Sequence, residues 1–382
     1  MLRKEEIRYV RETIAPHVAP ILSLYVDVNP ARPENGNKAW LVRVKNTVRA
    51  LSVPRDVADR VISHLEVERP AARTYAMFAA HDLLQLYELQ VDLPLADVRN
   101  GRVQARWGEP YVFPLLYVLD EYERFGVVFI DQERWRFFEV FLGEIQEIGD
   151  AFAPLAKESG RLIIDRPAQR YVKGALLRGG AAGDRFVRHL EASVQRFYKQ
   201  MAHLLQQSVE SWHIDRLILM GPHEDTSLFE QYLPRSLRSR VACRLPSLPR
   251  PGASASEVAK KVEPVIEEVR KQQELDLLKQ VREKGIWGLS PVLEALQLGR
   301  LYVLVAPWNP TARVWRCENG LVVKDETEAR TLCPDEQAHQ VELSDVLVDL
   351  AASYATRLEF VKDEVEEVLH RDFGGLAGIP RW

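Results

Sequence analysis

The sequence is poor in cysteine and has no long apolar run. It contains three cysteines in 382 residues, Cys243, Cys317 and Cys333. Three thiols cannot build the disulfide framework of a small secreted domain, which favours a reducing compartment. No apolar stretch approaches the roughly 20 residues of a membrane-spanning helix, and the charged N-terminus lacks the apolar segment of a signal peptide. The sequence therefore predicts a cytoplasmic protein without a membrane segment.

The motifs of several enzyme classes are missing as well. The chain has no Walker loop, no Gly-x-Ser-x-Gly elbow and no His-Glu-x-x-His pair, and the spacing from Gly174 to Gly179 lacks the Lys-Ser/Thr step of a phosphate-binding loop. The sequence therefore predicts neither a nucleotide site nor a cofactor.

Positive charge is unevenly distributed. The formal net charge of −4 argues against a surface coated in positive charge for generic nucleic-acid binding. Residues 161–200, however, contain nine basic and three acidic residues, a local charge of +6. Five further arginines lie in residues 235–250 with no acidic residue among them. The middle third of the chain is therefore distinctly basic.

The alternation of short apolar runs with amphipathic segments predicts three mixed α/β domains, at residues 1–114, 115–250 and 257–382. The Pro/Ser/Gly/Ala-rich stretch 246–256 is the expected linker before the third domain. Strands are expected at 21–28, 75–80, 83–89, 125–131, 134–142, 144–149, 216–220 and 301–306. Helices are expected near the N-terminus to residue 14, at 38–51, 55–65, 184–207, 227–232, 256–284 and 290–298, and from about 343.

The most informative segment runs from Arg178 to His189. The paired glycines Gly179 and Gly180 let the backbone take positive φ and approach a ligand closely. A basic helix follows directly, and the N-terminus of a helix favours anionic groups through its free N–H donors and its dipole. Together these features suit a loop that enters a phosphate-rich cavity.

Gly179, Gly180, Arg185 and Phe186 fall in register with the peptidyl-tRNA hydrolysis loop of archaeal and eukaryotic class-I release factors, which this segment resembles. In that family Gly-Gly-Gln precedes Arg-Phe, whereas Ala181 occupies the glutamine position here. An alanine side chain has neither donor nor acceptor and cannot orient a water molecule. No catalytic residue is therefore predicted, although Asp184 or His189 remains an alternative acid or base.

Four more segments carry the same resemblance in the correct order: residues 125–131, 217–222, 293–300 and 358–382. They are similar to the release factor/Pelota superfamily, and most of all to its bacterial members, which include release-factor-like proteins and hibernation factors of the Balon type. The resemblance implies a decoding-centre-like N-terminal domain, an RNase H-like middle domain and a C-terminal domain that binds partners such as a translational GTPase. It also implies a molecule that imitates tRNA in the ribosomal A site.

The resemblance identifies the ribosome, through its rRNA and A site, as the expected partner. Candidate contacts are Arg178, Gly179, Gly180, Ala181, Gly183, Arg185, Arg188, Arg196 and Lys199, with Lys38 and Arg43 in the first domain. The segment Asn35–Trp40 departs almost everywhere from the stop-codon-reading loop of the family, so stop-codon specificity is not supported. The alternative interpretation of Lys38 and Arg43 is a solvated helix face.

Cys317 and Cys333 resemble the first cysteines of the two knuckles of a zinc ribbon. Gly320 and Glu336 stand where the second cysteines would be. Because a structural zinc ion needs four ligands, we predict no bound metal and expect two small, semi-buried thiols.

The sequence leads to one preferred function and two alternatives. The preferred function is occupancy of the A site, in hibernation or rescue, without peptidyl-tRNA hydrolysis. The first alternative is a release or rescue hydrolase that positions water through its backbone or His189. The second is a non-ribosomal interaction protein on the same fold.

Overall fold

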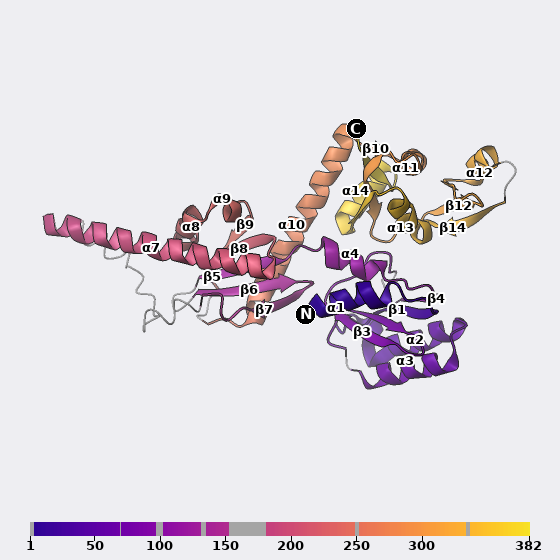
Figure 1. Ribbon diagram of the computed structural model, residues 1–382, viewed down its shortest axis with the longest axis horizontal. Coiled ribbons are helices and arrows are strands. Elements are labelled where there is room, and N and C mark those ends of the chain that lie inside the picture. The colour runs from indigo at the N-terminus through magenta and orange to yellow at the C-terminus, as the bar shows by residue number, and fades with distance from the viewer. Residues whose placement is uncertain are drawn as a thin grey trace. The chain divides into compact units, whose positions relative to one another are not determined.

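The computed structural model describes residues 4–68, 70–96, 102–130, 135–152, 181–248, 252–333 and 337–382. It is a mixed α/β structure, as the sequence predicted, and it includes four β-sheets (Figure 1). By internal contacts it divides into two compact units. Unit 1 comprises Glu121–Ile266, and unit 2 comprises Leu2–Asp120 with Glu267–Trp382. The boundaries of three domains stay a prediction.

Unit 1 is built on a five-stranded sheet of order β7-β6-β5-β8-β9. Strands β5, β6 and β7 form an antiparallel meander, while β8 is parallel to β5 and β9 is parallel to β8. The strands are β5 (Phe125–Ile130), β6 (Trp135–Phe141), β7 (Glu144–Glu147), β8 (Arg216–Met220) and β9 (Val241–Leu245). The helices are α7 (Ala181–Trp212), α8 (His223–Tyr232) and α9 (Arg235–Arg238). The first four strands confirm the sequence prediction, whereas β9 and α9 were not predicted.

Helix α7 packs on this sheet through an apolar stripe. Tyr198, Met201, Leu205 and Val209 are buried in one cluster with side chains of the sheet, and their spacing of three or four residues places them on one helical face. Gly126 of β5 lies where a Cβ atom would stand 2.7 Å from the Phe137 ring, so only glycine fits there. The N-terminal part of α7 extends beyond the edge of the sheet (Figure 1).

The N-terminal part of unit 2 is a four-stranded antiparallel sheet of order β3-β2-β1-β4. Its strands are β1 (Ile21–Asp27), β2 (Thr74–Ala79), β3 (Leu84–Leu89) and β4 (Val103–Gly108). Its helices are α1 (Lys4–Tyr9), the π-helical η1 (Val10–Ile14), the 3-10 segment η2 (Pro33–Lys38), α2 (Ala39–Ala50), α3 (Arg55–Val67) and α4 (Phe113–Glu121). One face of β1 and β2 packs with α2 and α3 around the buried Trp40.

Two of these elements, β4 and α4, were not predicted, and α4 spans the predicted boundary at residue 114. Strand β4 is half-buried along its whole length. Its residues Val103, Ala105 and Trp107 alternate with polar ones and pack on the core, a period-two signal that the sequence analysis overlooked. Helix α4 packs against the C-terminal part of unit 2, where Tyr117 and Phe360 meet edge to face at 4.9 Å. The Tyr117 hydroxyl accepts a hydrogen bond from the Phe360 N–H at 3.0 Å. The packing of α4 therefore depends on residues distant in sequence.

The C-terminal part of unit 2 holds a second four-stranded sheet, of order β10-β16-β11-β15. Its strands are β10 (Ile286–Trp287), β11 (Leu301–Pro307), β15 (Arg357–Val361) and β16 (Ala377–Pro380), and its helices are α11 (Leu289–Gln297), α13 (Leu343–Ser353) and α14 (Asp363–Phe373). Helix α10 (Ala255–Lys284) leads into it from unit 1. Gly374 ends α14 with φ 70°, a left-handed cap that favours glycine.

A third region, which we call the Cys arm, comprises residues 313–342. It contains the three-stranded sheet β13-β12-β14 and one helix. The elements are β12 (Arg313–Cys317), β13 (Val322–Val323), α12 (Glu326–Leu332) and β14 (Ala338–Glu342). Cys317 and Cys333 are joined by a disulfide with a Cα–Cα distance of 6.5 Å.

This disulfide corrects the sequence analysis, which expected Cys317 and Cys333 to be two separate, semi-buried thiols. The two cysteines are 16 residues apart, and no sequence pattern indicates that the fold returns the end of α12 to the end of β12. Cys243 is the free cysteine of the described chain.

Candidate RNA-binding site

The start of α7 is one half of the predicted site. Arg178, Gly179 and Gly180 lie outside the described residues. Helix α7 begins at Ala181, three residues earlier than predicted, so Ala181 and Gly183 belong to its first turn. The first N–H groups of a helix have no partner within that helix. The backbone at Ala181 therefore retains the anion-binding character expected of this position.

The exposed face of α7 carries basic side chains. Arg196 and Lys199 are exposed, while Tyr198 beside them is buried against the sheet. His203 and Gln207 continue the exposed face at spacings of four residues. The sheet thus fixes which side of α7 faces outward in its described part, and that side includes both predicted contacts.

Arg185 and Arg188 extend the same face by position. At 100° per residue, positions 185, 188, 196 and 199 of a regular helix fall within an arc of about 80°. Glu191 and Asp184 fall outside that arc. We call residues 185, 188, 196 and 199 the α7 stripe. The stripe begins close to the glycine pair in the sequence and runs along a single side of the helix backbone.

The other half of the predicted site, Lys38 and Arg43, is held by contacts within the N-terminal part of unit 2. The Arg43 guanidinium donates to the Glu34 carbonyl at 2.8 Å and to the Asn35 side-chain oxygen. Lys38 Nζ donates to the Glu66 carbonyl at 2.5 Å. Both basic groups therefore stabilise the positions of η2 and the start of α2.

A buried carboxylate anchors this loop. Asp27 is 2% exposed and accepts hydrogen bonds from the Asn29 N–H at 3.0 Å and from Asn35 Nδ2 at 2.9 Å, with Arg32 as an ion-pair partner. Asn35 thus links Asp27 to Arg43. The sequence analysis missed Asp27 and Asn35. An acidic residue at the end of an apolar strand, followed within eight residues by an amide, was the available signal.

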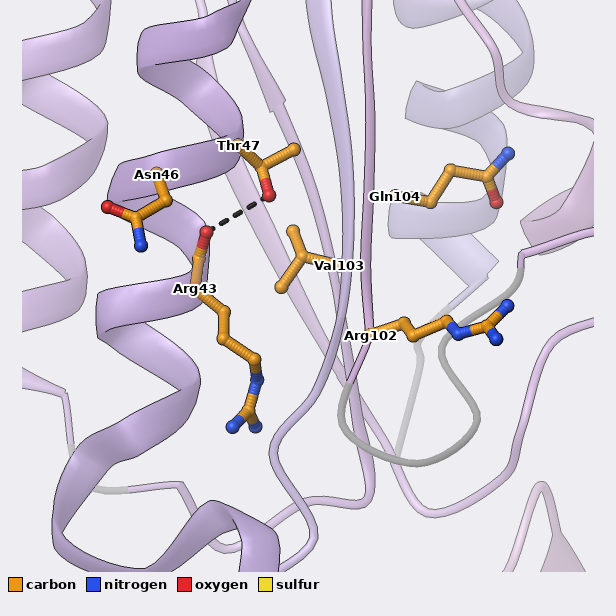
Figure 2. Close-up of a pocket in the computed structure, with 6 residues that line it drawn as sticks. All are labelled: Arg43, Asn46, Thr47, Arg102, Val103 and Gln104. Carbon is orange, nitrogen blue, oxygen red and sulfur yellow. Dashed lines mark hydrogen bonds between the residues drawn. The ribbon is translucent and has the colours of Figure 1, made fainter.

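A groove of about 460 Å³ lies beside Arg43, between α2 and the start of β4. It is lined by Arg43, Asn46, Thr47, Arg102, Val103 and Gln104. Figure 2 shows that Val103 points toward α2, whereas Arg102 and Gln104 extend from the other side of β4, as alternate residues of a strand do. The Thr47 hydroxyl is already bonded to the Arg43 carbonyl at 3.0 Å. The polar groups around this groove do not converge on one ligand position.

No cluster of three or more His, Cys, Asp or Glu side chains suited to a metal ion occurs in the described part of the chain. Within the same residues, every helix is too short or too polar to span a bilayer.

Similarity to solved structures is broad in coverage and low in identity. The crystal structure of the archaeal translation termination factor aRF1 is 16% identical over 100% of this chain and 99% of its own, with a TM-score of 0.26. Archaeal Pelota, in a ribosome-bound structure that also contains ABCE1, is 13% identical over 99% and 94%, with a TM-score of 0.39. Dom34 of S. cerevisiae, a translation termination-like factor that interacts with Hbs1, is 10% identical over 81% and 86%, with a TM-score of 0.38.

No curated protein matches the sequence. A family model does match residues 110–267, which contain the glycine pair, all of α7 and the sheet of unit 1. The match confirms the resemblance that the sequence motifs indicated. The model that matches residues 110–267 is that of bacterial archaeo-eukaryotic release factor family 10.

Proposed function

We propose that this protein is a release-factor/Pelota-like translation factor that occupies the ribosomal A site, in hibernation or rescue, without hydrolysing peptidyl-tRNA. The observation that carries the proposal is the α7 stripe. Four basic positions on one side of a helix that follows a glycine pair in the sequence suit phosphate contacts along rRNA. Arg178 and the N–H groups from Gly179 to Gly183 would contact rRNA or a tRNA end at the tip.

The sheet of unit 1 supports an RNase H-like middle domain. A meander of three antiparallel strands continues into two parallel strands, with a helix between the two parts. In this arrangement α7 is fixed by the core at residues 198–209, and its basic end is carried beyond the sheet (Figure 1). A helix held by the core at one end, with basic positions on its outer face, suits entry into a narrow RNA cavity.

The absence of hydrolysis follows from Ala181. It stands in the first turn of α7 and has no polar side-chain atom with which to place a water molecule. The same proposal assigns the N-terminal part of unit 2 to the decoding centre. It does not count Lys38 and Arg43 as phosphate contacts, because both donate to acceptors within this part of the fold. It assigns the C-terminal part to partners that include a translational GTPase, and it places the protein in the cytoplasm.

The test is co-sedimentation with 70S ribosomes over a salt series. The variant is Arg196→Glu with Lys199→Glu, and the matched control is Lys260→Glu with Lys261→Glu, two exposed lysines of α10. Both variants change the net charge equally. We expect the stripe variant to bind about 100-fold more weakly at moderate salt, because several phosphate contacts add together, and the control to bind like the wild type.

Three outcomes separate the candidate functions. Saturable binding that competes with A-site tRNA and releases no peptide supports the proposal. Peptide release from the same complexes favours the hydrolase. If the wild type stays in the supernatant with vacant, stalled and stationary-phase ribosomes alike, the ribosomal assignment fails and the non-ribosomal interaction protein is left.

A further inference from the structure

The Cys arm has a very small core. Its buried cluster consists of Cys317, Val323, Ala329 and Cys333, with Trp315, Leu321 and Ala338 packed partly buried around them. Modules below about 40 residues rarely bury enough apolar surface to fold without a cross-link, a metal or a partner. The disulfide is therefore a main source of order in this arm.

The two ends of α12 are fastened in different ways. At its start, the Asp325 carboxylate accepts from the Glu328 N–H at 3.0 Å, and Glu328 accepts from the Ser290 hydroxyl at 2.5 Å. At its end, Cys333 bonds covalently to Cys317 at the end of β12. Leu332 beside it is 60% exposed and adds little packing. The disulfide is thus the link that ties the C-terminal end of α12 to the sheet of the arm.

We propose that Cys317–Cys333 is a reversible redox site whose state controls whether α12 is docked on the sheet of the Cys arm. The reductant is a dithiol of the thioredoxin class. One of its thiolates attacks a sulfur of the disulfide and breaks the S–S bond, and its second thiol resolves the mixed disulfide. Two electrons and two protons pass to the protein, which is left with two thiols while the reductant becomes a disulfide.

Burial makes this exchange conditional on local opening. Cys317 is 1% exposed and Cys333 is 4% exposed, so a thiolate reaches the bond only when the end of α12 lifts. Once reduced, α12 keeps its hydrogen bonds at Asp325 and Glu328 but loses the tie at Cys333. Lifting of the helix then uncovers the apolar faces of Trp315 and Leu321.

Cys243 provides an internal reference. It is half-buried in unit 1, and burial raises the pKa of its thiol, which lowers its reactivity at neutral pH. Thiol counts on the full chain under denaturing conditions should give one thiol after aerobic purification and three after treatment with thioredoxin and its reductase. The Cys243→Ser variant should give no thiol after aerobic purification and two thiols after the thioredoxin treatment.

Hydrogen exchange at the amides of residues 327–332 measures whether α12 is docked. We expect reduction to raise their exchange by about 100-fold, the order of effect for releasing a loop of about 15 residues. Cys317→Ser with Cys333→Ser should exchange at the reduced level in either condition, while Cys243→Ser should respond like the wild type. Amides of β8 should not change in any variant.

Each of three results would overturn the proposal. They are three thiols in the aerobic protein, a disulfide that resists the native thioredoxin system, and equal exchange of α12 in both redox states. None of these measurements contains a ribosome. The inference therefore stands or fails separately from the proposed function.

Discussion

Basic side chains have different environments in the two units. In unit 2, Lys38 and Arg43 donate to acceptors of their own loop and of the end of α3. In unit 1, Arg196 and Lys199 lie on the outer face of a helix whose other face is used by the core. The sequence analysis had grouped all four as RNA contacts, because charge and helical spacing are alike in the two places.

The difference teaches that a basic residue must be judged by the acceptors around it. A guanidinium that satisfies carbonyl and amide oxygens stabilises the protein, and its removal leaves those oxygens unpaired. An exposed ammonium on a helix face, such as that of Lys199, contributes little to stability and is the better candidate for a phosphate contact. Three predictions test this distinction, in order of expected effect.

The largest effect is expected at the centre of the loop network in unit 2. Asp27→Ala removes the acceptor shared by Asn29, Arg32 and Asn35. We expect it to lower the free energy of unfolding by about 3 kcal/mol, because it leaves the buried Asn35 amide and two part-buried donors without their acceptor. Chemical denaturation measures the loss. Asp92→Ala is the control, since Asp92 is 51% exposed and 4.0 Å from Arg32, and it should cost less than about 0.5 kcal/mol. Equal stability of both variants would show that the network is dispensable.

The second effect is a pH dependence of stability that comes from Glu274, a carboxylate with fewer hydrogen-bond donors than Asp27. Burial raises the pKa of Glu274 from 4.5 to about 7, although the Lys362 N–H at 3.3 Å opposes the change. Between these pH values the unfolded chain loses this proton while the native state keeps it. The native state therefore loses stability as pH rises from about 4.5 to 7, by about 2 kcal/mol after allowance for partial exposure.

Glu274→Gln should remove this dependence. We expect the variant to be about 2 kcal/mol more stable than the wild type at pH 8 and no more stable at pH 4.5. Thermal or urea unfolding across that range gives the difference. Glu283→Gln, at an exposed position of the same helix, should follow the wild type. A parallel pH profile for Glu274→Gln and the wild type would contradict the assignment.

The smallest effect compares one lysine from each unit. Lys38→Met removes a single hydrogen bond to the Glu66 carbonyl and should cost about 0.5 kcal/mol or less. It should leave the slope of log affinity against log salt for ribosome binding unchanged. Lys199→Met should leave stability unchanged and lower that slope by about 1, the value for one lost phosphate contact. A lower salt slope for Lys38→Met would show that Lys38 contacts RNA and would contradict this prediction.

Elements that obey one local period were predictable. Helices α2, α3, α10 and α11 and strands β1, β5, β8 and β11 lie within a few residues of their predicted ranges, because their own side chains carry the apolar pattern. Strands β4, β9 and β14 were missed. They are mostly half-buried. Strand β4 does carry a local alternation in Val103, Ala105 and Trp107, whereas β9 and β14 are recognised as strands through neighbours that are remote in sequence.

The candidate site divides in the same way. The register of Gly179, Gly180, Arg185 and Phe186 and the local charge of +6 are properties of the sequence. The periodicity of α7 also predicts which of its residues share a face. Whether Arg43 faces an acceptor depends on η2, where Asn37 and Lys38 take positive φ, a turn that the sequence analysis did not anticipate.

The sequence by itself determined the resemblance to release factors, the mixed α/β class, the basic character of the middle region and the alanine at position 181. These follow from residue identity and from local periodicity, which need no knowledge of distant neighbours. Only the tertiary structure decided that Cys317 bonds to Cys333, that Asp27 holds the loop containing Asn35, and that Lys38 and Arg43 are engaged within the fold. Each of these depends on which atoms the chain brings within bonding distance, and that is fixed by packing across the whole unit.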